Sequence, residues 1–562
     1  MKRTLLSFIY VLFISNCFSQ WNNNPMVNNM VWTPGTLDDN LHYTEPVSDG
    51  AGGSIVFFVT EVSYPGPYRQ RILAQRISAT GNILWGDTLN AVVISEALSQ
   101  LYIITAVADG TGGAFIAWPD YRHSPGYEGE IYAQHIDSSG NILWPADGLR
   151  ITNLSPASDV YSVSICTDGN GGLFLGYSVD NLVSDWQTYA QHLDAAGNKL
   201  WGANGLQVCA APGFRHCSGL VRDNNNGVIC LMGDSRNDVF GLNYDSLIEH
   251  EPSNMDIYGQ RLDAAGNKLW AADGVPICNV PGNQDMYGDG LVCGSDGDGG
   301  AYMFFEDWRN DSSGTTENVD IYGQRVNASG NTLWGANGLA ICTAPGNQFT
   351  RSVAKEDSAL AICWADVDLN SHWSQRVNIT GQATWAANGI RITDQMPYHY
   401  QISVTGDSAG NFVYGYATDQ FVRAQKIDPS GSFHWGPDGT LVSAKPYYYN
   451  YSTPELVTGP DHSVIFTWVG LATSIDPSVI AAKLLSDGSL SLSPGETYFT
   501  TAGGNWNNPA IWAGNKLPPA NAVIVVRHPI IVTANTTCYS LKVEPPSGSV
   551  TVKTGVKLTV VH

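Results

Sequence analysis

The stretch Tyr258-Gly-Gln-Arg-Leu-Asp-Ala-Ala-Gly-Asn-Lys-Leu-Trp270 indicates the fold of this chain, because versions of it recur along the sequence. A full copy has a Gln, a Gly six residues later and a Trp four residues beyond that Gly. Seven copies keep all three residues: Gln75/Gly81/Trp85, Gln134/Gly140/Trp144, Gln191/Gly197/Trp201, Gln260/Gly266/Trp270, Gln324/Gly330/Trp334, Gln375/Gly381/Trp385 and Gln425/Gly431/Trp435. An eighth copy keeps only Gly488, with Ala482 and Leu492 where Gln and Trp are expected. Successive glycines stand 50 to 69 residues apart, and a repeat of this length indicates a solenoid, a propeller or an array.

Within each repeat the apolar residues recur with a period of two, as in Tyr189-Ala-Gln-His-Leu193, and Gly-rich turns separate the runs. This pattern predicts β-hairpins, and no stretch shows a helical period. A second hairpin precedes the repeated phrase and turns on Asp-Gly-x-Gly-Gly, as at 49–53, 109–113, 168–172 and 296–300. Its glycines permit the positive φ that such turns need. Each repeat is therefore expected to form four antiparallel strands.

Four-stranded sheets with aromatic residues on both faces bury them by stacking around an axis. We therefore predict an all-β protein with an eight-bladed β-propeller over residues 21–494. The segment Trp21-Asn-Asn-Asn-Pro-Met-Val27 resembles Trp201-Gly-Ala-Asn-Gly-Leu-Gln207, which leads into a predicted fourth strand. This match predicts that the N-terminus adds a strand to the last blade and closes the ring.

The tail, residues 495–562, contains apolar-rich runs but no copy of the repeated phrase. We expect a short β-module there, either the opening rungs of a β-helix or a small separate fold. The tail stops on an apolar run at His562. Either an edge strand is left open there, which proteins normally avoid, or the natural chain is longer.

Residues 1–20 resemble a secretory signal peptide, with Lys2-Arg3, an apolar run over 5–14 and small residues near Ser19. We therefore expect a secreted protein or one on the outer cell surface, with a lipid anchor at Cys17 as a less favoured alternative. No other segment is long and apolar enough to span a bilayer. Net charge is −23, which disfavours nucleic acid and anionic lipid as partners.

Nine cysteines remain once the signal peptide is removed, an odd number. Cys209, Cys278 and Cys342 fall at the same place, eight residues after the repeated Trp. Equivalent places on separate blades lie too far apart to bridge, so we predict small buried core residues there. Cys209 with Cys217 is the best local candidate for a disulfide.

The phrase Leu262–Trp270 resembles the tryptophan-docking repeat of quinoprotein-type eight-bladed propellers, in which the Trp is held against the next blade. Enzymes of that group carry an adjacent pair of cysteines beside the quinone and a Glu/Asn/Asp set around calcium. No Cys-Cys dipeptide exists in this chain, so the resemblance carries over the scaffold and not the dehydrogenase activity.

The whole chain is similar to the large secreted repeat proteins of Gram-negative bacteria that use a C-terminal sorting domain for surface delivery. Asp256-Ile-Tyr-Gly-Gln260 and Ile277-Cys-Asn-Val-Pro-Gly-Asn-Gln284 are phrases that carry this likeness. The resemblance implies a secreted or surface location. No recognisable sorting domain follows in this sequence, which puts surface attachment in doubt.

Binding residues are expected on the long connections between second and third strands, which share one rim of the ring. Three repeats begin this connection with Asp-x-Arg and carry aromatic residues nearby. The candidate binding residues are Asp120, Tyr121, Arg122, Tyr127, Asp234, Arg236, Tyr244, Asp307, Trp308 and Arg309. An acidic, aromatic rim suits an extracellular glycan or protein ligand. The alternative is that a repeated Asp-x-Arg pair ties a strand end to its neighbour, which we consider the more common role of such pairs.

Catalytic and metal-binding motifs are missing from the sequence: the twelve histidines are scattered, with no His-Glu-x-x-His and no Gly-x-Ser-x-Gly. We expect no cofactor. Calcium at Asp296-Gly-Asp298-Gly-Gly is possible in principle, but a plain turn is favoured there.

These observations favour a non-catalytic adhesion or ligand-binding scaffold. One alternative is a secreted carbohydrate-active hydrolase or lyase that uses rim carboxylates from Glu306, Asp307 and Glu251. Another is a structural spacer in a longer surface fibre.

Overall fold

The computed structural model describes most of the chain after the first twenty residues. The described residues are 21–23, 25, 28–34, 39–62, 69–99, 103–123, 129–154, 158–180, 186–237, 254–285, 292–311, 318–394, 402–418, 421–444, 453–471, 477–491, 497–513, 517–518, 522–538, 540–544 and 548–560. They form two compact units. One comprises residues 22–79 and 83–491, and the other comprises 497–560 together with Trp21 and Thr80–Asn82.

The first unit consists of eight antiparallel sheets, or blades, in chain order. Blades 1 and 2 are β2 (Asp39–Ser48), β3 (Ser54–Val62), β4 (Arg69–Ile77), β5 (Val92–Ser99) and β6 (Thr105–Ala108), β7 (Ala114–Asp120), β8 (Glu130–Ile136), β9 (Leu149–Arg150). Blades 3 and 4 are β10 (Asp159–Thr167), β11 (Leu173–Asp180), β12 (Gln187–Leu193), β13 (Leu206–Gln207) and β14 (Arg215–Arg222), β15 (Val228–Asp234), β16 (Asp256–Leu262), β17 (Val275–Cys278). Blades 5 and 6 are β18 (Gln284–Asp285), β19 (Cys293–Ser295), β20 (Ala301–Asp307), β21 (Asp320–Val326), β22 (Leu339–Cys342) and β23 (Gln348–Glu356), β24 (Ala359–Asp366), β25 (Ser371–Asn378), β26 (Ile390–Thr393). Blades 7 and 8 are β27 (Ile402–Gly406), β28 (Phe412–Ala417), β29 (Val422–Ile427), β30 (Thr440–Ser443) and β31 (Glu455–Thr458), β32 (Val464–Leu471), β33 (Pro477–Leu484), β1 (Asn29–Trp32).

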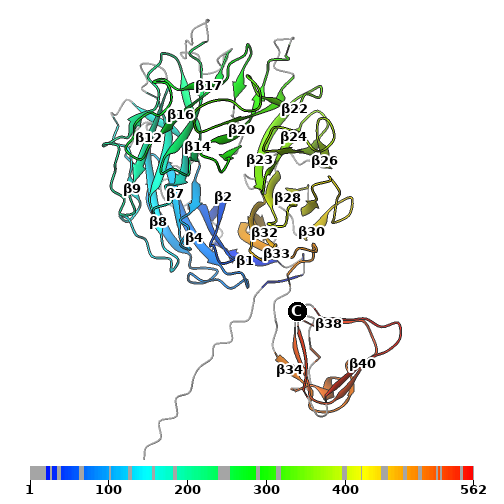
Figure 1. Ribbon diagram of the computed structural model, residues 1–562. Helices are drawn as coiled ribbons and strands as arrows, with labels where there is room; N and C mark the ends of the chain where they lie inside the picture. Colours follow the sequence, from blue (N-terminus) through cyan, green and yellow to red (C-terminus); the bar gives the residue numbers. More distant parts are fainter. Residues whose placement is uncertain are drawn as a thin grey trace, which may run out of the picture. The chain divides into compact units, whose positions relative to one another are not determined.

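The blades form a closed ring (Figure 1). Each blade contacts the next one along the chain, and β31 of blade 8 returns to β2 of blade 1. The predicted eight-bladed β-propeller of four-stranded antiparallel blades is therefore confirmed. In blade 5 the first strand is split into β18 and β19, which both pair with β20.

The ring closes through its N-terminal strand. β1 pairs antiparallel with β33, with Asn29 opposite Ala481 and Met30 opposite Ile480. The first strand of the chain is thus the outer strand of the last blade. This pairing joins the two ends of the propeller by backbone hydrogen bonds as well as by side-chain packing.

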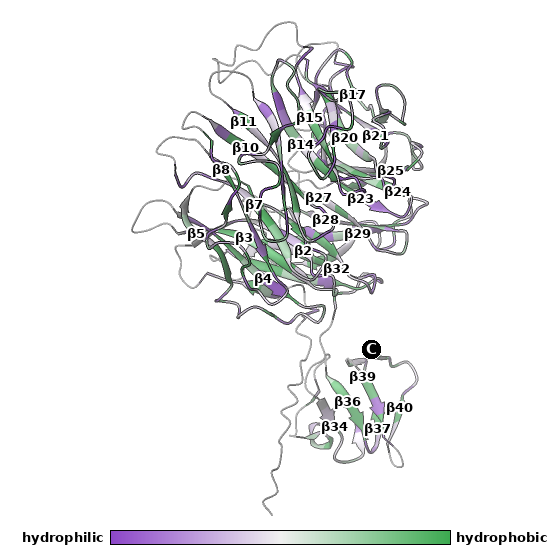
Figure 2. Cartoon of the chain, turned by 60° about the vertical axis from the view of Figure 1, so that its left-hand side comes forward, coloured by the Kyte–Doolittle hydropathy of each residue, from purple (hydrophilic) through white to green (hydrophobic). Residues whose placement is uncertain are grey.

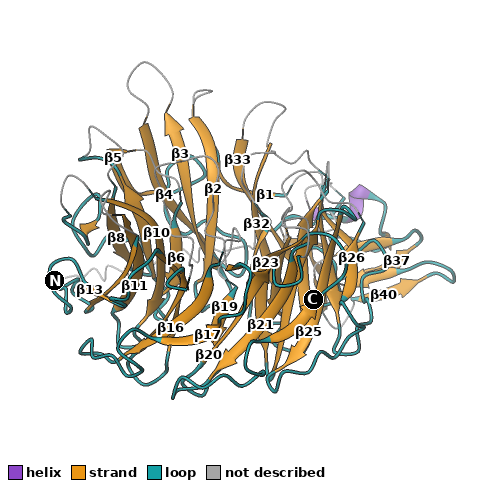
Figure 3. Cartoon of the chain, turned by 90° about the horizontal axis from the view of Figure 1, so that it is seen from above, coloured by secondary structure: helices purple, strands orange, loops and turns teal. Residues whose placement is uncertain are grey.

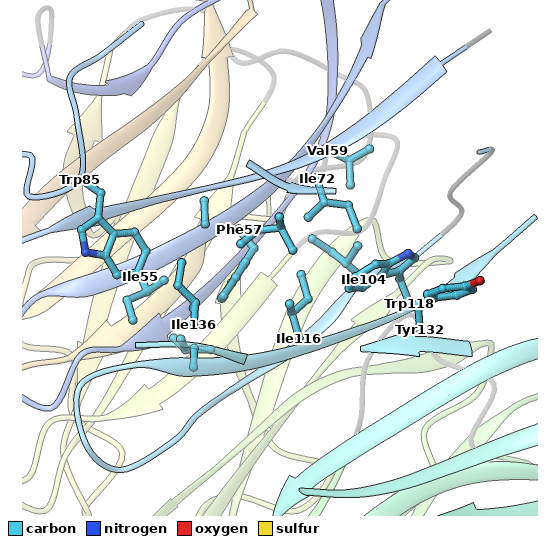
Figure 4. Packing of buried hydrophobic residues seen from close by; sticks show 14 residues of the cluster. Ile55, Phe57, Val59, Ile72, Trp85, Ile104, Ile116, Trp118, Tyr132 and Ile136 are labelled. Atoms are coloured by element: carbon cyan, nitrogen blue, oxygen red, sulfur yellow. The ribbon is translucent and has the colours of Figure 1, made fainter. Parts of the chain in front are cut away.

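The core lies between the blades, because each sheet buries both faces. Figure 4 shows Ile55, Phe57 and Val59 of blade 1 interleaved with Ile116 and other apolar residues of blade 2. The same arrangement recurs between the following blades. Apolar residues are concentrated on the strands, and the turns are more polar (Figure 2).

The repeated Gln is buried, the repeated Trp is buried or half-buried, and both are hydrogen-bonded. The Gln260 side-chain oxygen accepts from the N–H groups of Arg261 and Trp270 at 3.0 and 3.1 Å, and its amide donates to the Ala271 carbonyl at 2.6 Å. The Trp270 indole N–H donates to the Ala328 carbonyl of the next blade at 3.0 Å. Each repeat is therefore fastened both within its own blade and to its neighbour.

The repeated Gly provides the surface on which the preceding Trp docks. A Cβ on Gly330, whose φ is +84°, would lie 3.2 Å from the Trp270 ring. The same contact recurs at Gly140/Trp85, Gly197/Trp144, Gly266/Trp201, Gly381/Trp334, Gly431/Trp385 and Gly488/Trp435, and Gly81 meets Trp21. Trp21 thus stands in for the tryptophan that the eighth copy lacks.

The second unit is a short coil of parallel strands, the geometry of a β-helix. Its strands form three parallel sets: β34 (Thr497–Phe499), β36 (Val523–Val526) and β39 (Ser540–Val543); β35 (Gly504–Asn505), β37 (Pro529–Val532) and β40 (Ser549–Val552); β38 (Thr536–Cys538) and β41 (Leu558–Val560). Trp506, Trp512 and Ile524 are among the residues of its core. One turn of 3-10 helix, η1 (Pro509–Ile511), is the helical element of the described residues (Figure 3).

The cysteines are free thiols wherever the structure describes them. The disulfide predicted between Cys209 and Cys217 is therefore wrong: the Cys209 sulfur faces Arg236 and Asp273, while Cys217 lies in β14. The buried positions predicted for Cys209, Cys278 and Cys342 are confirmed. Within the described ranges no helix is long and apolar enough to cross a membrane.

Candidate functional site

The Asp-x-Arg motifs form an internal ion pair at the end of the second strand. In blade 4 the Arg236 guanidinium donates to the Asp234 carboxylate at 2.5 Å and to the Asp273 carbonyl at 2.9 Å. It also contacts the Cys209 sulfur at 3.1 Å and lies 3.8 Å from the centre of the Tyr258 ring. The arginine therefore joins three parts of its own blade to Cys209, which lies just past the outer strand of blade 3.

Blade 5 repeats this arrangement. Arg309 donates to Asp307 at 2.5 Å and to the Asn337 carbonyl at 2.9 Å, and its guanidinium lies 3.8 Å from the centre of the Tyr322 ring. The Cys278 sulfur is 3.1 Å from the same guanidinium nitrogen. Because two blades use the same four kinds of contact, this geometry supports the structural alternative for the motif.

Blade 2 has the same pair, but the Ser95 hydroxyl of blade 1 takes the place of the cysteine sulfur, 3.4 Å from the guanidinium. Arg122 donates to the Asp120 carboxylate and to the Asp147 carbonyl, the latter at 2.9 Å, and stacks 4.0 Å from the centre of the Tyr132 ring. The Trp118 indole N–H also donates to Asp120, at 2.9 Å. The carboxylate is buried and satisfied from two sides.

The aromatic candidates differ in their accessibility. Tyr121 and Trp308 are half-buried at the rim, and the Tyr121 hydroxyl donates to the Val160 carbonyl of blade 3 at 3.4 Å. Tyr127 and Tyr244 lie outside the described residues. Among the candidates that the structure describes, Tyr121 and Trp308 are the aromatic residues, and the ring of each is partly exposed.

Rim carboxylates proposed for catalysis also have internal roles. Glu306 is buried, and one of its oxygens accepts from the N–H and hydroxyl of Thr350 in blade 6, at 3.0 and 3.2 Å. Burial raises the pKa of Asp307, although its bonds with Arg309 oppose this shift. Glu251 lies outside the described residues. Glu306 and Asp307 therefore connect strands and blades.

The Asp296 loop is a turn tied to an arginine. One Asp296 oxygen accepts from the N–H groups of Asp298 and Gly300 at 2.8 Å each. Arg325 donates to the other Asp296 oxygen at 2.9 Å and to Asp298 at 3.1 Å. This geometry supports the plain-turn alternative, because a cation already neutralises the carboxylates.

A second set of carboxylates lies on the inner strands at the start and end of the ring. Glu45 is in β2 and Glu455 in β31, and both are half-buried. Burial raises the pKa of Glu45 to about 8, and the charge of Glu455 adds to this shift. Burial alone raises the pKa of Glu455 to about 7. The pair is thus close enough to interact electrostatically, and it titrates near neutral pH.

Sequence reasoning missed this pair because its two members are 410 residues apart. The useful signal was that Glu45 and Glu455 occupy the same place in their repeats. Glu45 is opposite Phe57 and Glu455 is opposite Thr467, and each of these partners is the fourth residue of its second strand. Ring closure then brings the first and last repeats together.

Metal-ligating side chains do not gather elsewhere in the described ranges: no group of three or more His, Cys, Asp or Glu is positioned to hold an ion.

No protein-family model and no curated protein matches this chain. Among solved structures, the chain is similar to an ulvan lyase from a new polysaccharide lyase family, with 10% identity over 84% of this chain and 97% of that one and a TM-score of 0.40. It is similar to the α-L-arabinofuranosidase Arb93A from Fusarium graminearum, with 10% identity over 83% and 99% and a TM-score of 0.35. The Hadza microbial sialidase Hz136 has 11% identity over 65% and 76% and a TM-score of 0.32.

Proposed function

We propose that this protein is a secreted or cell-surface propeller that binds an extracellular glycan or protein through its long-loop rim and catalyses no reaction there. The observation that carries the proposal is that the described rim carboxylates are committed to internal contacts. Asp120, Asp234 and Asp307 pair with arginines, and Glu306 bonds to the next blade. The signal-peptide pattern at residues 1–20 supports the extracellular location.

The arginine pairs also explain how such a rim would work. Each pair fixes the end of a second strand to the segment that leads into the outer strand of the same blade. The loops that follow therefore start from rigid positions, which lowers the entropy lost when they contact a ligand. Tyr121 and Trp308 offer half-buried aromatic surface beside these pairs, suited to stacking on a sugar ring or packing on a protein.

The carbohydrate-active hydrolase is the less favoured candidate. A glycosidase needs two carboxyl groups on either side of the scissile bond. Glu45 and Glu455 titrate in a useful range, but they lie on opposite sides of β2. Glu45 points from β2 toward blade 2, where it accepts from the Ala106 N–H. Glu455 lies on the other side of β2, on the face of blade 8 that meets blade 1. They therefore do not face each other across one substrate.

A glycan array probed with the full-length mature chain, with and without calcium, tests the proposal. We expect a defined set of glycans to be retained, and we expect Trp308→Ala and Tyr121→Ala each to weaken binding about tenfold, in line with the loss of one stacking contact at ~1.4 kcal/mol. Leu89→Ala, at an exposed site in blade 1 away from the Asp-x-Arg pairs, is the control. Turnover of a polysaccharide that Glu306→Gln or Asp307→Asn abolishes would overturn the proposal in favour of the hydrolase.

A further inference from the structure

In blades 1 and 3, the same position of the inner strand accepts a hydrogen bond from the next blade around the ring. Glu45 accepts from the Ala106 N–H of blade 2. Ser164, its equivalent in blade 3, accepts from the Leu220 N–H of blade 4 at 3.1 Å. The shared position is defined by register, because Glu45 and Ser164 each pair with the fourth residue of their second strand.

Glu455 occupies this position in blade 8, where the next blade is blade 1. Leu456 packs between blades 7 and 8, so its neighbour Glu455 points to the opposite face, toward blade 1. Register places Pro46 where Ala106 and Leu220 stand in their blades. Proline has no N–H. The carboxylate of Glu455 therefore lacks the backbone donor that Glu45 and Ser164 have.

Two buried hydroxyls, of Thr44 and Thr467, lie at this interface between blades 8 and 1. We call the interface the closure seam and define it as Glu455 and Thr467 of blade 8 with Thr44 and Pro46 of blade 1. Thr467 is directly opposite Glu455 in the β31–β32 pair, so their side chains project from the same face. Thr467 is fully buried and Thr44 is 7% exposed. Neither hydroxyl has a hydrogen-bond partner among the residues that the structure describes. Buried polar groups without protein partners normally bind water or an ion.

We propose that the closure seam binds a hard, oxygen-preferring cation such as Ca²⁺, with the Glu455 carboxylate and the Thr44 and Thr467 hydroxyls as its protein ligands. All three groups offer oxygen, the ligand atom that calcium prefers. Glu455 is half-buried, so one side is open for the waters that complete a shell of six to eight oxygens. The ion would join the first and last blades at the point where the ring closes.

Charge favours a cation over a water molecule in this seam. Glu45 lies close enough to Glu455 for the two to interact electrostatically, and a divalent cation in the seam would favour the ionised form of both. The whole chain carries −23, so its field concentrates cations at the surface. A bound divalent cation would remove the cost of holding Glu455 ionised in a partly buried site.

Calorimetric titration of the full-length chain with CaCl₂, after treatment with EDTA, tests this inference. We expect one binding site, a rise in Tm with calcium, and at least tenfold weaker binding in Glu455→Gln and in Thr467→Val, which both keep the side-chain shape. Glu96→Gln removes a carboxylate of the same type from the exposed surface of β5 and is the matched control, which should bind as the wild type does.

The wild-type titration decides the question even if a seam variant fails to fold. No heat of binding and no change of Tm with calcium would mean that water, not a cation, occupies the seam, and would overturn the inference. Undiminished affinity in folded Glu455→Gln would also overturn it, because the ion would then bind elsewhere.

Discussion

A glycine in the tight turn between third and fourth strands leaves room for the tryptophan of the preceding blade. Gly381 approaches such a ring closely, because a Cβ there would lie 2.6 Å from Cδ1 of Trp334. Its φ of +86° is also a conformation that side chains disfavour. Gly410 has a similar φ, +90°, but nothing lies within 4 Å of its Cβ position.

These two glycines separate backbone strain from loss of tryptophan packing. We expect Gly410→Ala to lower the free energy of unfolding by ~1 kcal/mol, from backbone strain alone. Gly381→Ala should cost about 3 kcal/mol, since it adds a clash with the Trp334 ring. Urea unfolding measures both. Equal losses in the two variants would contradict the docking role of the glycine.

Glu45 and Glu455 predict a specific dependence of stability on pH. Their pKa values rise from 4.5 to about 8 and about 7 in the folded chain. The folded state therefore holds more protons than the unfolded state between pH 4.5 and 8, so these two groups lower the free energy of unfolding as pH rises through that range. Their stabilising effect is fully present below pH 4.5 and is lost once pH exceeds the folded pKa values.

The Glu45→Gln/Glu455→Gln double variant removes this dependence. Unfolding in urea at pH 5.5 and pH 8, with EDTA present, should show a smaller loss of stability in the variant than in the wild type. The same loss in both proteins would mean that other groups cause it.

At the scale of elements, the Asp-x-Arg pairs hold the second strand to the outer part of its blade. Asp307→Ala leaves Arg309 without its carboxylate in a largely buried site, and we expect it to cost about 3 kcal/mol. Asp298→Ala is the control. Its side chain is 81% exposed and its ion pair with Arg325 is worth less than ~1 kcal/mol. A negligible effect of Asp307→Ala on thermal unfolding would contradict the structural role of the pair.

Sequence patterns predicted the strands and blades well, because period-two alternation and Gly-rich turns depend on local contacts. The Gln side chain is an example: its buried, hydrogen-bonded role follows from its recurrence beside the Trp. The candidate binding residues were predicted less well. Whether Asp234 faces a ligand or Arg236 depends on side-chain directions that spacing does not determine.

At the scale of the whole molecule, features of the ring depend on contacts between the ends of the chain. The sequence showed that Trp21 matches the repeated tryptophans. In the structure Trp21 contacts Gly81, as each repeated tryptophan contacts the glycine of the next repeat. The sequence did not predict the closure seam. It combines Thr44 and Pro46 with Glu455 and Thr467, and only the closed ring brings these residues together.

Disulfide trapping between the N-terminal strand and the last blade tests most directly whether the first strand closes the ring. Asn29 and Ala481 are opposite each other in β1 and β33, within the reach of a disulfide. Thr467 pairs with Ala481 on the other side of β33, which puts Asn29 and Thr467 two strands apart, at roughly 10 Å.

Mass spectrometry after mild oxidation reads out the result. A ring closed by its first strand should form an intramolecular disulfide in Asn29→Cys/Ala481→Cys and none in Asn29→Cys/Thr467→Cys. A folded Asn29→Cys/Ala481→Cys protein in which both introduced thiols stay open to alkylation would contradict a ring closed by its first strand.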